Sequence, residues 1–358
     1  MSGEAAVRLL GMPPPASRRA LDAGQEMGVA PAPKVQTLLA VCACPDCFSN
    51  LEISPAGLRC TDCGREFEIR SGIPILLPRS TDAIGQRYLV NYETIASDDL
   101  AKPFEPNRPA RHEKLKEFIG SVTNKRVLDI GSSDATYLRQ MDASVKVALD
   151  IAIEYLVQIP EDSDVVGVCA DAEQLPIKPG YFDVVIISDV LEHVLHPERV
   201  VDHLVRICRP ETRLIVHVPW EEDLSMYRDR PYEFTHLRSF NSYKFQLLFR
   251  EFYERRSRGT YPRVIPLPYR LYGWLPRPIY NWMIFVVQRT RLGNVFNRTW
   301  QRWAAELPRR EWWLLRIYAP VYRQFELRLL SGTRRYRFGL WLRRRLKLER
   351  GGPTAAAK

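Results

Sequence analysis

The chain contains 358 residues, which exceeds one ordinary domain and predicts two or three folded units. Apolar residues make up 46% and charged residues 26% of the sequence, which is typical of a globular protein and argues against a largely disordered one. The longest apolar run, Ile279 to Val287, is far shorter than the ~18 to 20 residues that span a bilayer. We therefore expect a cytoplasmic protein without a transmembrane helix.

The two ends of the sequence have the composition of unfolded segments. Residues 1–34 are rich in Ala, Pro and Gly, show no sustained periodicity, and lack the basic start and apolar stretch of a secretory signal. They predict a disordered leader, and residues 351–358 predict a short disordered tail. Folded domains are therefore expected between residues 35 and 350.

Charge and tryptophan are unevenly distributed along the chain. From Arg263 onward, Lys and Arg outnumber Asp and Glu by 21 to 4, whereas before it they are outnumbered 31 to 38. Seven of the eight tryptophans lie in the same basic part, between Trp274 and Trp341. The sequence thus predicts two electrostatically different regions, with a separate role for the basic one.

Five of the seven cysteines cluster between residues 42 and 63. Cys44 and Cys47 form one Cys-x-x-Cys knuckle, and Cys60 and Cys63 form a second, so that four thiolates can complete a tetrahedral zinc shell. A set of free thiols or a disulfide is the alternative, and Cys42 could replace Cys44 with poorer spacing. We predict a structural zinc site, with a β-hairpin between the two knuckles.

The stretch from Leu38 to Pro78 resembles a known family, the small zinc-ribbon activator subunit of tRNA, rRNA and release-factor methyltransferases. The resemblance is carried by Cys44-Pro45, by Cys63-Gly64 and by the run IRSGIPILL at residues 69–77. It implies a module that stabilises or positions a methyltransferase. Such a ribbon could pack on its own chain or recruit another protein.

The segment from Lys125 to Pro219 alternates predicted strands with predicted helices, the pattern of a parallel sheet with crossover connections. Apolar runs bounded by turn residues indicate strands that are buried on both faces. The fold class is therefore predicted to be α/β and Rossmann-like. The expected strands are 126–130, 145–149, 165–169, 182–188 and 213–219, and the expected helices are 110–119, a helix from about 136, and 197–208.

Small and acidic residues follow the predicted strands. The run Gly131 to Ala135 follows the first strand and offers backbone N–H groups at the carboxyl edge of the sheet. Asp150 ends the second strand, where a carboxylate can accept hydrogen bonds from ribose hydroxyls. Asp171 and Ala172 follow the third strand. These positions predict a nucleotide-like ligand.

These segments resemble the class I S-adenosylmethionine methyltransferases, especially the branch related to ubiquinone and small-molecule methylation. The matching segments are VLDIGSSDA, ALD, ADAEQLPIKPGYFDVVIISDVLEHV and RLIVHVP. The resemblance implies a methyltransferase with S-adenosylmethionine as cofactor. It places Asp129 and Gly131 beside the methionine moiety, Asp150 beside the ribose, Asp171 and Ala172 beside the adenine, and Asp189 facing the site.

The sequence departs from that family in the first loop. The family usually has three glycines there, whereas this chain keeps Gly131 and has Ser133 and Ala135 at the later positions. Both replacements are small, so we expect cofactor binding to persist with Ser133 among the binding residues. An ordinary strand-to-helix turn in a non-catalytic scaffold is the alternative.

Methyl transfer requires the acceptor atom in line with the methyl carbon, and correct orientation alone can make it fast. Where the acceptor carries a proton, a base is useful, and His236 in the segment EFTHLRSF is our candidate. A structural role in anchoring that loop is the alternative for His236. His193 and His196 are expected to make local hydrogen bonds.

Beyond Pro262 the resemblance ends. A proline-punctuated segment is followed by predicted helices at 281–291, 300–306 and 310–345. Tryptophan and tyrosine interleaved with arginine fit the headgroup layer of an anionic membrane. The same residues could instead bind RNA or form helix faces packed on the catalytic domain.

The leading functional hypothesis is methylation of a small molecule, or of a lipid- or glycan-linked acceptor, at the inner face of a membrane. RNA methylation is the second hypothesis, and a non-catalytic scaffold is the third. The predicted regions are a leader (1–34), a zinc ribbon (35–80), a linker and helix (81–123), the methyltransferase domain (124–262), a basic aromatic, mainly helical region (263–350) and a tail (351–358).

Overall fold

The computed structural model describes residues 32–79, 83–97, 108–222, 224, 234–259 and 322–345. Most of the predicted leader, the predicted tail, the proline-punctuated segment and the predicted helices at 281–291 and 300–306 lie outside these residues.

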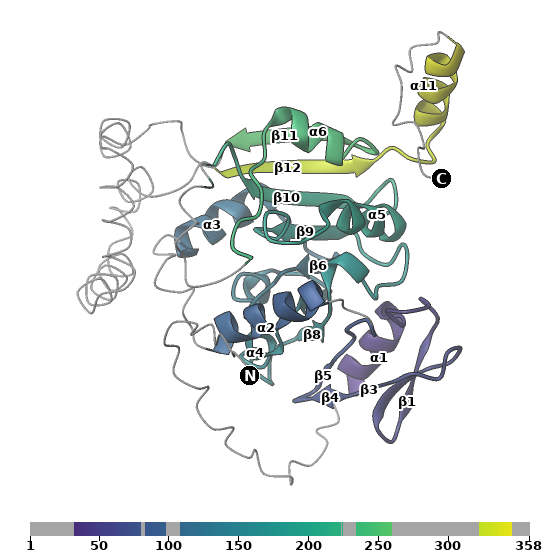
Figure 1. Ribbon diagram of the computed structural model, residues 1–358, viewed down its shortest axis with the longest axis vertical. Helices are drawn as coiled ribbons and strands as arrows, with labels where there is room; N and C mark the ends of the chain where they lie inside the picture. The colour runs from purple at the N-terminus through teal and green to yellow at the C-terminus, as the bar shows by residue number, and fades with distance from the viewer. Residues whose placement is uncertain are drawn as a thin grey trace, which may run out of the picture.

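A seven-stranded sheet forms the centre of the described structure, with the order β11-β12-β10-β9-β6-β7-β8 (Figure 1). Strands β6 to β10 run parallel to one another, as predicted, and their side chains are almost entirely buried. The parallel strands are β6 (Arg126–Ile130), β7 (Val145–Asp150), β8 (Val165–Cys169), β9 (Val184–Ser188) and β10 (Arg213–Pro219). The predicted Rossmann-like α/β class is confirmed.

Helices and short turns connect these strands. Helix α5 (Pro197–Ile207) begins with a proline at its first turn, a position that has no helical partner for an N–H group, and it buries Val200, Val201, Leu204 and Ile207. The predicted helices at 110–119 and 197–208 are therefore confirmed. The other helical elements are α2 (Ala83–Ser97), α3 (Arg108–Ile119), η2 (Leu138–Gln140), α4 (Ile153–Leu156), η3 (Ala172–Gln174) and α6 (Ser242–Leu248).

The helix predicted from about residue 136 is wrong, because only the three-residue 3₁₀ turn η2 forms there. Ala135 has a left-handed backbone (φ 54°), and the Asp134 side chain accepts a hydrogen bond from the Thr136 N–H at 3.1 Å. Such a side-chain turn satisfies the backbone in place of a helical bond.

The helix predicted over 310–345 is wrong for Tyr322–Leu329, which forms strand β12. This strand lies between β10 and β11 (Phe252–Gly259) and is antiparallel to both. Phe325 packs on Phe245 and Trp220, at ring-centroid distances of 3.9 and 5.3 Å, so tertiary pairing overrides the local composition. The sheet therefore extends past residue 262, and among the described residues 322–345 the helix is α11 (Arg334–Arg345). Residues 310–321 of the predicted helix lie outside the described residues.

The ribbon contains two small sheets that follow helix α1 (Ala32–Val41). Leu51–Ser54 and Gly57–Cys60 form the hairpin β1–β2, as predicted. Gly57 has φ 127°, and a Cβ there would lie 2.4 Å from the Phe67 carbonyl oxygen, so this position requires glycine. The remaining strands are β3 (Glu66–Phe67), β4 (Ile69–Arg70) and β5 (Ile73–Pro74).

The ribbon packs on the large sheet of its own chain, at the end formed by β8 (Figure 1). Ribbon residues Leu38, Leu58 and Phe67 belong to the same buried apolar cluster as Leu175 and Ile177. The Phe48 ring contacts α5, where it lies 5.5 Å from the His203 ring and 4.3 Å from the Arg206 guanidinium. Three backbone hydrogen bonds join the two parts: Ala43 N to Pro176 O (2.8 Å), Lys178 N to Val41 O (2.8 Å) and Leu76 N to Cys169 O (2.7 Å).

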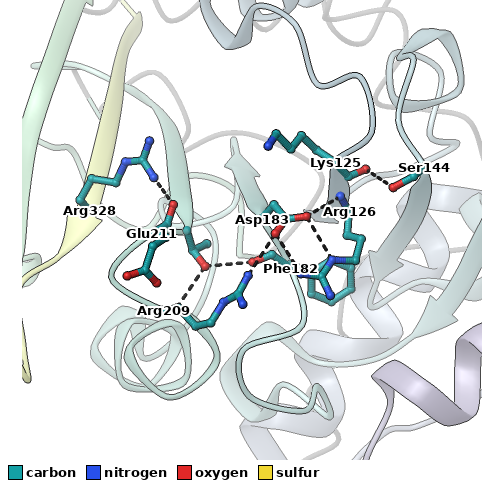
Figure 2. A network of polar contacts seen from close by, with 9 residues as sticks. Lys125, Arg126, Ser144, Phe182, Asp183, Arg209, Glu211 and Arg328 are labelled. Atoms are coloured by element: carbon teal, nitrogen blue, oxygen red, sulfur yellow. Dashed lines mark hydrogen bonds and ion pairs between the residues drawn. The ribbon is translucent and has the colours of Figure 1, made fainter.

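A polar network joins strand starts at the amino edge of the sheet (Figure 2). Arg126 at the start of β6 donates to Asp183 from Nε (3.1 Å) and Nη2 (2.9 Å), and Arg209 donates to the same carboxylate at 3.0 Å. Arg328 donates to the carbonyl oxygen of Glu211. Hydrogen bonds and positive charge from Arg126 lower the pKa of Asp183 to about 2. This edge is held together by satisfied ion pairs.

Candidate cofactor, acceptor and metal sites

The four predicted zinc ligands come together in the ribbon. The Sγ atoms of Cys44 and Cys63 lie 3.8 Å apart, those of Cys47 and Cys60 lie 3.4 Å apart, and all four fall within 4.8 Å of one another. Tetrahedral Zn–S bonds of ~2.3 Å require sulfur atoms roughly 3.8 Å apart. The cluster therefore fits a zinc ion, and zinc itself stays a prediction.

The other cysteines lie away from this cluster and are buried. Cys42 is fully buried and does not belong to the cluster of four sulfur atoms, so Cys44 takes the ligand position. Burial raises the pKa of Cys169 and Cys208 to about 12, so both thiols are protonated and unreactive at neutral pH.

The predicted cofactor residues meet at the carboxyl edge of the large sheet, where parallel α/β sheets bind ligands. Gly131 follows β6 with φ 73°, and a Cβ there would lie 2.1 Å from Val190 Cγ2. No larger residue fits at this position without movement. The turn therefore brings its backbone close to the chain that follows β9.

Ser133 and Ala135 take the conformation that glycine favours. Their φ angles are 51° and 54°, both in the left-handed region. A residue with a Cβ pays roughly 1–2 kcal/mol for this conformation. The loop thus keeps a glycine-like path although two of the three usual glycines are missing.

Asp150 holds this loop from the end of β7. Its Oδ2 accepts a hydrogen bond from the Ser133 N–H at 2.8 Å, and its Oδ1 accepts one from the Ala152 N–H at 3.1 Å. A carboxylate can accept about four hydrogen bonds, so these two are compatible with further bonds from ribose hydroxyls.

Asp129 is completely buried beside the loop. The Tyr137 hydroxyl donates to its Oδ1 at 2.6 Å, a contact that sequence reasoning missed because Tyr137 lies in the mispredicted helix. Burial raises the pKa of Asp129 to about 8, and the Tyr137 hydrogen bond only partly opposes this shift. A cationic ligand would favour the ionised form.

Asp171 and Ala172 begin the turn η3 after β8. The Asp171 side chain caps this turn by accepting the Glu173 N–H at 2.8 Å, and burial raises the pKa of Asp171 to about 6. The ribbon holds the same turn, because Gln174 Nε2 donates to the Pro45 carbonyl at 2.8 Å. The expected adenine side therefore lies directly against the zinc ribbon.

Asp189 follows β9 with a left-handed backbone (φ 55°). Its carboxylate lies 3.2 Å from Ser188 Oγ and 3.2 Å from His217 Nδ1. His217 is fully buried and stacks on Tyr322 at 4.7 Å. Asp189 is thus tied to the β10 and β12 strands as well as placed at the carboxyl edge.

His236 lies beside His193, which follows β9, and Glu222, which follows β10, and we call this region the acceptor side. His236 Nδ1 is 2.5 Å from Glu222 Oε2, and its ring lies 4.7 Å from the His193 ring at 87°. Sequence reasoning missed Glu222, which has no motif around it. His236 therefore has a carboxylate partner, as a histidine base or ligand commonly does.

His196 has a different place from His193. Its side chain is 48% exposed and pairs with Glu198 at 3.3 Å, which fits the predicted local role. Its backbone N–H donates to Glu173 at 2.8 Å.

Comparison with known families decides the class of the central domain. Residues 128–216 match the model of a methyltransferase domain family. The central segment is a methyltransferase domain. The predicted resemblance is therefore confirmed over the strands and loops that carry Asp129, Gly131, Asp150, Asp171 and Asp189.

Two curated relatives match about 30% of this chain. A ubiquinone/menaquinone biosynthesis C-methyltransferase (UbiE) of Stutzerimonas stutzeri is 31% identical over 112 residues, which cover 28% of this chain and 44% of that protein. A ubiquinone biosynthesis O-methyltransferase of Bordetella parapertussis is 31% identical over 117 residues, covering 30% and 48%. The matches thus span less than half the length of either relative.

Solved structures with a similar arrangement are more distant in sequence. Haemonchus contortus phosphoethanolamine N-methyltransferase 2 in complex with S-adenosyl-L-methionine is 18% identical with a TM-score of 0.41, over 60% of this chain and 51% of that one. A Haloferax volcanii complex between the Trm112 methyltransferase activator and a methyltransferase is 13% identical with a TM-score of 0.45, over 68% and 97%.

Proposed function

We propose that this protein transfers the methyl group of S-adenosylmethionine to a small-molecule acceptor. The observation that carries the proposal is the convergence of Gly131, Asp150 and Asp171 at the carboxyl edge of a sheet whose sequence matches a methyltransferase domain. The two relatives described above are named for ubiquinone biosynthesis, which favours a small organic acceptor.

The cofactor residues contact different parts of S-adenosylmethionine in this proposal. Asp129 and Gly131 lie beside the methionine moiety, Asp150 accepts hydrogen bonds from the ribose hydroxyls, and Asp171 and Ala172 border the adenine. When bound, the cofactor supplies a methyl group on a positively charged sulfur. The chain holds that group in line with the acceptor, which is the main source of rate acceleration.

His236 is the proposed base for an acceptor that carries a proton. Because Glu222 engages Nδ1 at 2.5 Å, Nε2 is the atom that takes the proton. Asp189 is proposed to shape the acceptor side through its contacts with Ser188 and His217.

Isothermal titration with S-adenosylmethionine tests the cofactor site. We expect micromolar binding by the zinc-loaded protein, and binding about 10 to 100 times weaker for Asp150→Asn, because hydrogen bonds to a charged group contribute ~1.5–3 kcal/mol. Asp162→Asn is the matched control, since Asp162 is exposed on the loop before β8. No binding by folded wild-type protein would contradict the proposal and favour a scaffold.

We further propose that the acceptor is lipid-linked and is met at an anionic membrane surface. Helix α11 contains six arginines and no acidic residue. Phe338, Trp341 and Leu342 are exposed by 61%, 50% and 39%, and their spacing places them on one helix face. A basic helix with one exposed apolar face suits the headgroup layer of anionic lipids. Among the described residues no helix is long and apolar enough to cross a bilayer.

Vesicle flotation tests this surface. We expect the protein to float with phosphatidylglycerol vesicles at low salt and to stay unbound with phosphatidylcholine vesicles. Arginines are attracted by the net negative charge of phosphatidylglycerol, whereas phosphatidylcholine carries no net charge. Trp341→Glu should reduce the bound fraction, whereas Tyr243→Glu, at an exposed aromatic of α6, should not. If single-stranded RNA binds the protein and neither vesicle does, RNA replaces the lipid proposal.

A further inference from the structure

Three potential metal ligands meet at the acceptor side, far from the ribbon in sequence. Glu192 and His193 follow β9, and His236 lies in the segment after β10. Each of the three offers a ligand atom within 4.8 Å of those of the other two. The two imidazole rings lie nearly at right angles (87°), so both can direct a nitrogen to one point.

The backbone around the cluster is fixed by contacts that do not involve the ligand atoms. The Leu237 N–H donates to the Glu192 carbonyl oxygen at 2.8 Å. The Arg238 guanidinium donates to the carbonyl oxygens of Leu191 (2.8 Å), Val194 and Leu195 (3.0 Å). The two chain segments are therefore held together on both sides of the three ligands, as a preorganised site requires.

Glu222 orients one of the ligands. Its carboxylate, whose side chain is 3% exposed, lies 2.5 Å from His236 Nδ1. A histidine that binds a metal almost always donates its other ring N–H to a carboxylate, a carbonyl or water. With Nδ1 engaged by Glu222, Nε2 is the ligand atom of His236. When a cation is bound, this nitrogen no longer acts as the base, and the cation activates the acceptor instead. The His236 side chain is 12% exposed, so a small ion can reach it.

We propose that Glu192, His193 and His236 bind a divalent transition-metal cation and that Glu222 is a positioning residue for His236. Two imidazoles and one carboxylate suit Zn²⁺, Mn²⁺ or Fe²⁺. Three protein ligands leave coordination positions open for water or a substrate oxygen, whereas four cysteines in the ribbon close a zinc shell completely.

The chemical consequence rests on the proposed methyl transfer and narrows the acceptor to one that carries a hydroxyl group. A hydroxyl oxygen bound to the cation loses its proton to water more readily than a free one. That oxygen then forms a bond to the methyl carbon, the carbon–sulfur bond breaks, and its electron pair stays on sulfur. The products are a methyl ether and S-adenosylhomocysteine.

Metal titration of the full-length protein tests the site. Zinc-loaded protein is passed over a weak chelating resin that leaves the cysteine site filled, and Mn²⁺ or Co²⁺ is then added in a calorimeter. We expect one further cation per chain, with a Co²⁺ spectrum that lacks thiolate charge-transfer bands. Binding should be about 10 to 100 times weaker in Glu222→Gln, and weaker by at least as much in Glu192→Gln.

His196→Asn is the matched control, because His196 lies in the same segment but outside the cluster, and it should bind the cation like the wild type. No further cation in a wild-type protein that binds S-adenosylmethionine would overturn the metal site alone. Cation binding that Glu192→Gln leaves unchanged would also overturn it. If the protein binds the cation but not S-adenosylmethionine, the proposed function is refuted and the proposed metal site is supported.

Discussion

The pKa values of acidic residues are shifted in opposite directions at the two edges of the large sheet. At the amino edge, Arg126 and Arg209 satisfy Asp183 and lower its pKa to about 2. At the carboxyl edge, burial raises the pKa of Asp129 to about 8 and that of Asp171 to about 6. The amino edge therefore stabilises the fold with internal ion pairs. The carboxyl edge keeps carboxyl groups whose ionised forms are favoured by a positively charged ligand.

Backbone conformation differs between the edges in degree, because the amino edge also has a left-handed residue, Asn124 (φ 58°). Ser133, Ala135 and Asp189 all adopt left-handed φ angles at the carboxyl edge. Such strain persists only where surrounding contacts impose it, and it is frequent at binding sites. The ribbon contacts this part of the molecule through hydrogen bonds with Cys169, which ends β8, and with Gln174 and Lys178, which follow it.

Removing the metal from the ribbon should have the largest effect of the changes considered, and it should affect the carboxyl edge more than the amino edge. Cys60→Ser takes away one of four ligands, and structural zinc contributes about 10–16 kcal/mol to the folding of small zinc modules. We expect loss of zinc, faster amide exchange at Leu76, Ala43 and Lys178, and at least about tenfold weaker S-adenosylmethionine binding. Zinc assay, hydrogen exchange and calorimetry measure the three effects.

Cys208→Ser is the control for that experiment, because it changes a buried thiol outside the ribbon. It should keep zinc and cofactor binding. Amides of β6 and β9 should stay protected in Cys60→Ser, since the Asp183 network holds the amino edge. If Cys60→Ser loses zinc but binds the cofactor normally, the ribbon does not support the carboxyl edge.

Asp183→Asn should weaken the amino edge without affecting the site. The folded pKa lies below the unfolded value of ~3.9, so the ion pairs stabilise fully above that pH and are lost as pH falls through about 2. The carboxylate is a quarter exposed, so solvent screening reduces the effect to about 1–2 kcal/mol. Thermal unfolding should show this difference from the wild type at pH 7 and a shrinking difference below pH 4.

Asp162→Asn serves as the surface control and should unfold like the wild type throughout. Cofactor binding by Asp183→Asn at pH 7 should be unchanged. A stability difference that is the same at pH 7 and below pH 3 would mean that the ion pairs are not its source.

The sequence predicts the parallel strands well because each is mainly apolar and is bounded by turn residues, as in Val184–Ser188. The four cysteines of the predicted zinc site can also be identified from the sequence, since their spacing alone indicates metal binding. Strand β12 was missed because its Arg and Glu residues resemble an amphipathic helix, and only pairing with β10 and β11 makes it a strand. Glu222 was missed because its role depends on a contact with His236 that no local pattern encodes.

Ser133→Gly should produce the smallest and most specific change, at the strained loop of the carboxyl edge. Glycine adopts φ 51° without the cost of roughly 1–2 kcal/mol that serine pays, but it loses about 0.5–1 kcal/mol more backbone entropy on folding. The net expectation is a stabilisation of up to about 1 kcal/mol, read from thermal unfolding. Cofactor affinity should be kept, because the Ser133 N–H that bonds Asp150 remains.

Ser121→Gly should change the free energy of unfolding in the opposite direction from Ser133→Gly. Ser121 is exposed and is not among the described residues with positive φ. Glycine there brings the entropy loss and removes the exposed contacts of the Ser121 hydroxyl with Thr123, so it should destabilise by at least about 0.5–1 kcal/mol. Opposite signs for the two serine substitutions would locate the strain in the loop. Destabilisation by both would mean that the left-handed serine is not strained, and that the loop has adapted fully to the missing glycines.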